Sequence, residues 1–266
     1  SAVTISPATE SQGTSNDGFI GWLRLSGNHP NPEQYTDGDQ KYKVEQQIAK
    51  DAILAVDTYI DYASFDTDTS DGDSYGIGYF GLMGSGGWGA VSGAYGGSSP
   101  THLCAWSKEY LTWGTVNTIT SSQSVSFPKA DGNSASIFRM NTSDSNQYFL
   151  IENRQFSGYD LGFQGATGVS GHGGLVIYHI DKLKTDLWPN TSNEVNADET
   201  DKGVDVEEAN EGSLGYSMLD TKEYSAHTNM FFLSGNNTSF TDTTTPNSRL
   251  KNGNSTLISV TDISSY

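Results

Sequence analysis

Two short apolar runs constrain the fold of this chain more than any other feature. QYFLIENRQ at 147–155 and GLVIYHID at 174–181 are strand-length runs of aromatic, aliphatic and β-branched residues. Runs of this length, bounded by glycine and polar residues, are typical of β-strands with apolar neighbours on both faces. GFIGWLRL at 18–25 and TLISVTDI at 256–263 have a similar character and predict a first and a final strand.

The composition favours short elements joined by many turns. The 266 residues include 30 glycines, and only 34% of the residues are hydrophobic. Glycine and small polar residues interrupt helices and strands, so we expect long polar loops at 188–203 and 234–254. A chain of this length buries a substantial core, which predicts a single domain spanning residues 1–266.

Two segments carry helical patterns. Residues 103–111 follow Pro100 and place apolar side chains on one face, which predicts a short helix. Residues 41–60 have an apolar residue at every fourth position, which predicts a longer helix that packs on the core through one side. The repeating residues are Val44, Ile48, Ala52, Val56 and Ile60.

The net charge excludes some classes of partner. Fourteen basic and thirty-two acidic residues give a formal charge of -18. Such a surface repels nucleic acid and anionic membrane surfaces, and no apolar run is long enough to span a bilayer. Calcium or a cationic partner is the better match, and solubility in a salty external medium is the alternative explanation of the charge.

Two residues with reactive side chains are expected to be structural. Cys104 is the only cysteine, so no disulfide can form within the chain, and its apolar neighbours predict a buried thiol. His179 lies inside the predicted strand VIYHID. We expect a histidine that is hydrogen-bonded within a sheet, with no catalytic role.

The histidines lack the spacing of a zincin site. That site needs two histidines one helical turn apart, with a glutamate beside the first as general base. The chain has five histidines, and no two of them are four residues apart. The nearest pair, His172 and His179, is flanked by glycines. We therefore expect no catalytic residues and no zinc in this chain.

Six motifs together resemble one known family. They are GIGYFGLMGSGGW at 76–88, PTHLCAWSKEYLTW at 100–113, YFLIENRQFSGYD at 148–160, GGLVIYHID at 173–181, KGVDVEEAN at 202–210 and TTPNSRLKNG at 244–253. In this order they resemble the catalytic domain of the immune inhibitor A family of bacterial secreted zinc metallopeptidases. The resemblance implies an α+β, β-rich zincin-like domain with few helices and long polar loops, and an extracellular location.

The chain departs from this family at the zinc centre. Residues 76–88 resemble the methionine turn that lies under the family's zinc, with Met83, Gly84 and Ser85 at its centre. The family's segment with the HExxH helix and the third zinc ligand is absent, and residues 67–73 join its two flanks. The resemblance thus leaves the methionine turn a structural role only.

The missing segment leaves two functional hypotheses. The first is a non-catalytic metallopeptidase-like domain, a pseudoprotease, that binds a protein partner or assembles with itself. The second is an active secreted zinc endopeptidase whose central segment is missing from this sequence. A serine hydrolase is disfavoured, because Ser85 lies in GSGGW rather than in a full GxSxG turn before a helix.

Two acidic clusters are candidate cation sites. Asp66, Asp68, Asp71 and Asp73 supply hard oxygen ligands at close spacing around a glycine, which predicts a calcium site, with a solvated acidic loop as the alternative. The acidic cluster at 198–208 contains a lysine and lacks alternating ligands. That pattern favours a solvated loop.

Overall fold

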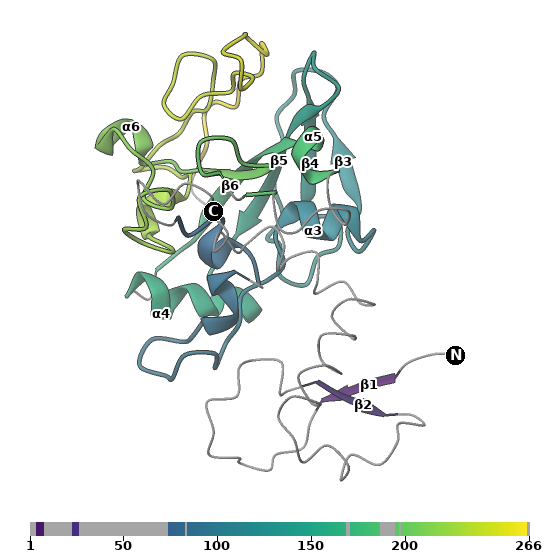
Figure 1. Cartoon of the computed structure of the whole chain (residues 1–266), viewed down its shortest axis with the longest axis vertical. Helices are drawn as coiled ribbons and strands as arrows, with labels where there is room; N and C mark the ends of the chain where they lie inside the picture. The colour runs from purple at the N-terminus through teal and green to yellow at the C-terminus, as the bar shows by residue number, and fades with distance from the viewer. Residues whose placement is uncertain are drawn as a thin grey trace. The chain divides into compact units, whose positions relative to one another are not determined.

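A computed structural model describes residues 4–7, 23–26, 74–82, 84–168, 171–186, 195–196 and 198–264. The chain divides into two compact units, Ser1–Ala55 and Val56–Tyr266. In the first unit β1 (Thr4–Pro7) pairs antiparallel with β2 (Leu23–Ser26), which overlaps the strand predicted at 18–25 (Figure 1). The helix predicted at 41–60 and the join at 67–73 lie outside the described residues, so the single-domain expectation stays a prediction.

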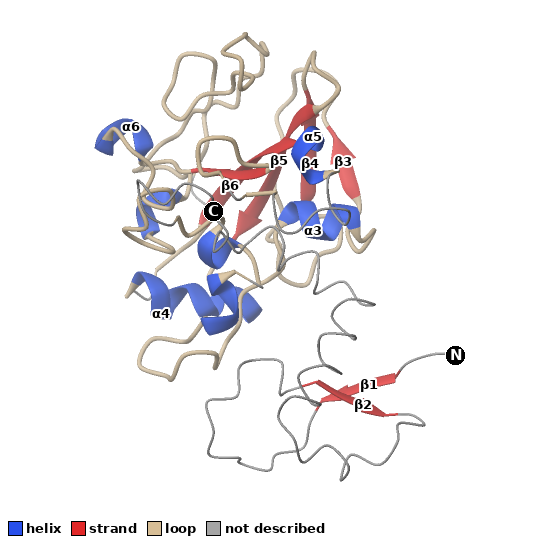
Figure 2. Ribbon diagram, in the orientation of Figure 1, coloured by secondary structure: helices blue, strands red, loops and turns tan. Residues whose placement is uncertain are grey.

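The second unit is built on a five-stranded sheet (Figure 2). The strands are β3 (Val116–Thr118), β4 (Ile137–Asn141), β5 (Gln147–Arg154), β6 (Gly174–Asp181) and β7 (Val204–Glu207). They lie side by side in chain order. The pair β3–β4 is parallel, and the other three neighbouring pairs are antiparallel.

The two apolar runs form the centre of this sheet, as predicted. β5 and β6 pair along their whole lengths, with Phe149 opposite His179 and Ile151 opposite Ile177. Every residue of β6 is buried, because both faces of the sheet are covered. Successive side chains alternate between faces. Even-numbered residues of β5, β6 and β7 lie on a first face, and odd-numbered residues lie on a second face.

A separate apolar core covers each face. On the first face, Tyr148, Leu150 and Tyr178 pack with the helix α3 (Ala105–Tyr110), which matches the helix predicted at 103–111. Cys104 precedes α3 and is buried, as predicted. On the second face, Phe149 packs edge-on against Phe240 at 5.3 Å between ring centres. Burial of each such ring contributes about 1.5–3 kcal/mol to stability.

The described helices are all short. Besides α3 they are η3 (Gly78–Phe80), η4 (Ser85–Trp88), η5 (Gly158–Gly162), α4 (Phe163–Thr167), α5 (Lys182–Thr185), α6 (Glu211–Leu214) and η6 (Thr228–Met230). The fold is thus α+β and rich in β-structure, as expected from the sequence. Within the described part of the chain, no helix is long and apolar enough to cross a membrane.

The prediction of a final strand at 256–263 is wrong. In this segment only Val260 pairs in the β manner, in an isolated bridge with Phe240. Leu257 and Asp262 have positive φ values of 61° and 55°. L-residues adopt this left-handed conformation rarely, and it breaks the extended path on both sides of Val260. The segment is therefore an irregular strap rather than a strand of the sheet.

Candidate functional site

Most residues of the predicted sites lie outside the described ranges. Met83 is one of them, and so are the calcium candidates Asp66, Asp68, Asp71 and Asp73. Of the methionine turn the structure places Gly84, which precedes η4, and Ser85, which begins it. The calcium site and the role of Met83 therefore stay predictions.

Close packing explains the glycines of the predicted methionine turn. Gly78 has a φ of +53°, and a Cβ atom there would lie 2.1 Å from the carbonyl oxygen of Ser225. A Cβ on Gly86 would lie 2.2 Å from Oγ1 of Thr101. No other residue type fits such contacts without a shift of the backbone. The turn is therefore packed tightly against the rest of the second unit.

A buried arginine connects this turn to the first face of the sheet. Arg154 donates two hydrogen bonds to Asp160, at 2.6 and 2.7 Å, and both side chains are fully buried. Its remaining N–H groups donate to the carbonyl oxygen of Phe80 at 3.0 Å and to that of His102 at 3.3 Å. Its Nη1 also lies 3.2 Å from the Tyr178 hydroxyl. This guanidinium fixes four parts of the chain.

Arg154 and Asp160 are both ionised. Burial by itself would raise the pKa of Asp160, but the Arg154 guanidinium outweighs burial and holds that pKa below its usual value. Burial likewise opposes the charge on Arg154, and the Asp160 carboxylate raises its pKa instead. Every strong donor and acceptor in the pair is used, so the cluster is structural rather than reactive.

The described histidines occupy separate settings. His102 lies 3.4 Å from Asp131 through its Nε2. His227 caps η6, where its Nδ1 accepts from the backbone N–H of Asn229 at 3.2 Å. His179 is buried in the sheet and contacts Gln147 at 3.1 Å. In the described part of the chain, no group of three histidine, cysteine or carboxylate side chains is arranged to hold a metal ion.

His179 is hydrogen-bonded within the sheet, as predicted from its position in a strand. The Gln147 amide oxygen also accepts from the N–H of Lys251, so Nε2 of His179 must carry the proton and donate. Its Nδ1 lies 3.5 Å from Glu207. Burial lowers the pKa of His179 to about 4 and raises that of Glu207 well above its usual range. At neutral pH the His179 ring in this contact is therefore uncharged, and burial favours the protonated form of Glu207.

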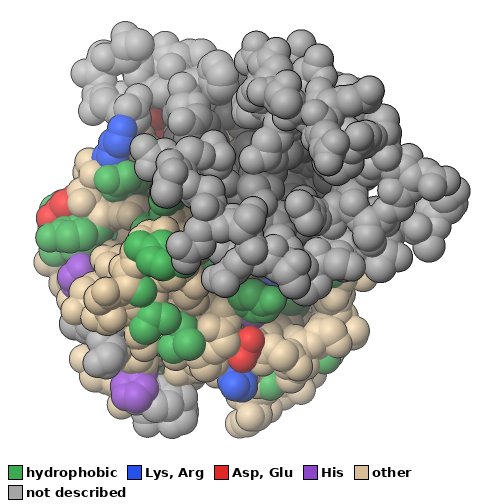
Figure 3. Space-filling view, turned by 90° about the horizontal axis from the view of Figure 1, so that it is seen from below, with side chains coloured by type: hydrophobic (Ala, Val, Ile, Leu, Met, Phe, Trp, Pro, Cys, Tyr) green, Lys and Arg blue, Asp and Glu red, His purple; other side chains and the backbone are tan. Residues whose placement is uncertain are grey.

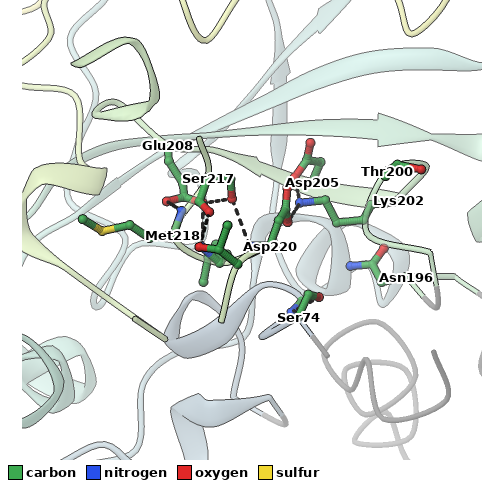
Figure 4. Close-up of polar contacts among 12 residues, drawn as sticks. Ser74, Asn196, Thr200, Lys202, Asp205, Glu208, Ser217, Met218 and Asp220 are labelled. Atoms are coloured by element: carbon green, nitrogen blue, oxygen red, sulfur yellow. Dashed lines mark hydrogen bonds and ion pairs between the residues drawn. The ribbon is translucent and has the colours of Figure 1, made fainter. Parts of the chain in front are cut away.

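The acidic cluster at 198–208 is the expected solvated loop only at 198–201, which are exposed or half-buried, and it enters the fold from Lys202 onward. Lys202 is almost fully buried, and its ammonium lies between Asp205 on β7 and Asp220, 2.6 Å from the latter (Figure 4). Burial alone would lower the pKa of Lys202, but the two aspartates raise it above its usual value. Val204 and Val206 of β7 lie in the core of the first face, and the half-buried Asp205 between them alternates to the opposite face.

Glu208 anchors the turn that follows. It is fully buried and accepts from the hydroxyl of Ser217 and from the backbone N–H groups of Met218 and Leu219, both at 3.0 Å (Figure 4). Burial raises its pKa, and these hydrogen bonds oppose the rise. Glu208 thus replaces the turn's missing backbone partners, which is a structural role.

A small cavity of about 210 Å³ opens beside these carboxyls. It is lined by His179, Glu207, Glu211, Arg249 and Lys251, among others. Burial and the neighbouring carboxylates raise the pKa of Glu211 to about 9, so Glu211 is protonated at pH 7, and burial with Asp205 raises the pKa of Glu207 as well. The cavity therefore offers hydrogen-bond donors and cations rather than a general base.

A much larger cavity, of about 1220 Å³, lies over the second face of the sheet. Its floor includes Met140 of β4, Ile151 of β5 and Leu175 of β6. Two irregular segments form its sides, and we call residues 119–129 the first wall and residues 257–264 the second wall. Small-molecule pockets measure about 300–1,000 Å³. This space suits a stretch of polypeptide better than a small ligand.

Sequence reasoning missed the Arg154 cluster and the large cavity. Glu152 and Arg154 continue the alternation of Tyr148 and Leu150 inside an apolar run, which was a usable signal of two buried charges. The first wall carries a weaker signal, the alternating SVSF at 124–127.

Searches among protein-family models, curated proteins and solved structures give no match to this chain. The resemblance to the immune inhibitor A family therefore rests on the six sequence motifs and stays a prediction.

Proposed function

We propose that this chain is a zincin-like, non-catalytic domain of an extracellular bacterial protein, and that it binds a polypeptide partner in the large cavity. The observation that carries the proposal is the cavity itself. Its floor residues Met140, Ile151 and Leu175 are buried, and its accessible apolar surface comes from the irregular walls, where Ile258 and Val260 are half-buried and Leu257 is exposed. Apolar side chains that remain accessible around one cavity commonly mark an interaction site.

The non-catalytic part of the proposal rests on the histidines. None of the five has a partner at the spacing of a zincin motif. His179 and His227 use their ring nitrogens in contacts that hold the fold together. A zinc-bound water as nucleophile needs imidazoles that converge on one point.

Exposed aromatic side chains give further support for a binding role. Trp88, Tyr95 and Tyr159 are each more than half exposed, at 62%, 72% and 64%. The hydroxyl of Ser99 donates to the carbonyl oxygen of Tyr159 at 3.2 Å, which ties the loop after Trp88 to η5. Figure 3 shows several groups of hydrophobic side chains among polar ones on the face seen from below. Tyrosine and tryptophan are enriched at protein interfaces.

The second candidate is an active zinc endopeptidase that carries a further central segment. The observation that favours it is the family order of the six motifs after residues 67–73, together with a weaker resemblance of VDTYIDYASFD at 56–66 to the family's segment before its zinc centre. An intact mass well above 28.6 kDa for the purified protein would favour this candidate.

A casein-binding measurement tests the first proposal, because casein lacks a stable fold and offers extended segments. With the protein immobilised, we expect saturable binding and recovery of intact casein. Leu257, 88% exposed on the second wall, is the residue to change. Leu257→Asn removes an apolar contact and is expected to weaken binding several-fold.

The matched control is Leu183→Asn, which replaces a leucine that is 65% exposed on α5 and does not line the cavity. It should bind casein like the unchanged protein. A lack of saturable binding, or fragmentation of the casein, would contradict the proposal.

A further inference from the structure

We propose that the large cavity takes an extended peptide segment of a partner protein, which adds as a β-strand to the open backbone edge of one of its walls. This inference rests on the proposed function and specifies the partner's chemistry. It predicts a segment with apolar side chains at alternate positions, no charge at its centre and basic residues at its ends.

Part of the first wall has backbone N–H and C=O groups without a backbone hydrogen-bond partner among the described residues. Residues 122–128 have no regular secondary structure, and Ser121 to Ser126 make no backbone hydrogen bond with the described residues. Exposure nevertheless alternates, with Val125 and Phe127 half-buried and Ser124 and Ser126 exposed. That period of two is the period of an extended chain. Between its bonded ends at Ile119 and Lys129, the first wall thus has the exposure pattern of an extended chain and backbone groups that are free to pair.

The second wall presents a similar edge. Val260 exchanges both of its backbone hydrogen bonds with Phe240, at 2.8 Å each. In an antiparallel pair the residues on either side point their N–H and C=O groups the opposite way. Ser259 and Thr261 therefore direct their backbone groups away from Phe240, and both line the cavity. Neither makes a backbone hydrogen bond with the described residues.

An open edge next to an apolar floor specifies what can bind. Unpaired N–H and C=O groups along an extended segment are completed by another extended chain, which is the mode called β-strand addition. Every second side chain of the added strand would point into the cavity, whose accessible apolar lining includes the half-buried Phe127, Ile258 and Val260. Those positions of the partner must be apolar.

Charge sets the remaining features of the partner. Lys129 and Asp262 are the charged residues that line the cavity, so its interior is close to neutral. The whole chain has a formal charge of -18. A segment that is uncharged in the middle and carries lysine or arginine at its ends fits both facts, because long-range attraction then speeds its approach.

The test uses a synthetic peptide about seven residues long, alternating valine and threonine and carrying lysines at both ends, which spans about 24 Å when extended. Its affinity for the purified protein is measured by calorimetry. A second peptide of the same sequence is N-methylated at alternate residues, so that it cannot donate along one edge. We expect saturable binding of the first peptide and at least about tenfold weaker binding of the second, the effect of about 1.4 kcal/mol.

Two proline variants locate the edge. Ser124→Pro and Ser259→Pro each remove a backbone N–H that is unbonded in the free protein, so the melting temperature should stay nearly unchanged. The matched controls Ser124→Ala and Ser259→Ala keep the N–H. We expect at least one proline variant to lose about tenfold in affinity and both alanine variants to lose nothing.

Three results would overturn the inference: no binding of the unmodified peptide, equal binding of the N-methylated peptide, or full binding by both proline variants. Concentration-dependent dimers that the peptide fails to dissociate would also overturn it, in favour of a second copy of the chain as occupant. If a proline variant does not fold, the N-methylated peptide with the unchanged protein still decides. Casein binding that survives any of these results would leave the proposed function intact.

Discussion

At the residue scale, single buried charges hold distant parts of this chain together. Arg154 is enclosed completely and contacts the turn at Phe80, the segment at His102 and the carboxylate of Asp160. Lys108 and Glu152 form a second buried pair beside it. Burying a charge without a partner costs several kcal/mol, so each of these residues depends on its neighbours.

Loss of the Asp160 charge should destabilise the fold strongly. Asp160→Asn keeps the shape of the side chain but removes the hydrogen-bonded counter-charge of the buried Arg154 guanidinium and leaves only Glu152, at 3.9 Å. We expect a loss of about 3 kcal/mol or more in the free energy of unfolding, measured by urea denaturation. The control is Asp186→Asn, which removes an exposed partner 4.0 Å from Lys182 and should change stability by less than about 1 kcal/mol. Equal effects of the two changes would contradict the account.

Stability should fall in acid because of His179. Its pKa is about 4 in the folded protein because of burial, and about 6.5 in the unfolded chain. Between these values the unfolded chain binds the proton and the folded protein does not, so stability declines as the pH falls from 6.5 to 4. The loss amounts to about 3 kcal/mol.

His179→Gln keeps a donor for Gln147 and removes this titration. The difference between the two urea midpoints, followed from pH 7 to pH 4, isolates the contribution of His179 from that of the nearby carboxyls. The unchanged protein should lose its advantage over the variant as the pH falls. A difference that is constant with pH would show that His179 titrates normally.

At the element scale, the sequence pattern predicts a strand or helix only where neighbouring elements then pack along it. The strands at 147–155 and 174–181 and the helix at 103–111 were predictable, because their apolar residues repeat with the period of the element. The segment 256–263 has similar residues but no neighbour along its length, and positive φ at Leu257 and Asp262 breaks it. Lys202, Glu207 and Glu208, at the ends of β7, were expected to be solvated, because composition does not reveal which charged residues of an acidic run are buried.

The ion pairs of Lys202 with Asp205 of β7 and with Asp220 should contribute measurably to the free energy of unfolding. Lys202→Met keeps most of the side chain's bulk and leaves Asp205 of β7 and Asp220 without their shared cation. We expect a loss of about 1–3 kcal/mol at pH 7 in the free energy of unfolding. The loss should shrink toward pH 4, because burial already raises the pKa of Asp220 and removal of Lys202 raises it further.

Lys129→Met is the matched control for this change. Lys129 is 55% exposed and lies 3.6 Å from Asp131, so its removal should change stability by less than about 1 kcal/mol. If both variants unfold at the same urea concentration, Lys202 does not join the two elements.

At the scale of the whole molecule, the fold class was predictable and the large cavity was not. Alternating and apolar runs set an α+β, β-rich fold, but the large cavity arises from the path of two irregular walls over the sheet. Such paths depend on single residues with unusual φ values and on contacts far apart in sequence, as between Val260 and Phe240. The acidic loop at 66–73 lies outside the described residues, so its calcium site is a prediction of the sequence alone.

Calcium should raise the melting temperature if that loop binds it. Carboxylates at Asp66, Asp68, Asp71 and Asp73 repel one another until a cation neutralises them. Binding to the folded chain alone then stabilises it, by about 2.7 kcal/mol at a hundredfold excess of calcium over the dissociation constant. Asp66→Asn combined with Asp68→Asn should abolish the rise, and Asp198→Asn should leave it unchanged. A rise that survives the double change would place calcium elsewhere.

The most direct test of the central claim is the zinc content of the purified protein, measured per chain after incubation with zinc and dialysis, alongside its hydrolysis of casein. An intact mass of 28.6 kDa must first establish that the sequence is complete as written. A chain in which no two histidines are four residues apart should retain clearly less than one zinc per molecule and should show no hydrolysis that a chelator inhibits. One zinc per chain together with chelator-sensitive cleavage of casein would contradict the account and identify an active metallopeptidase.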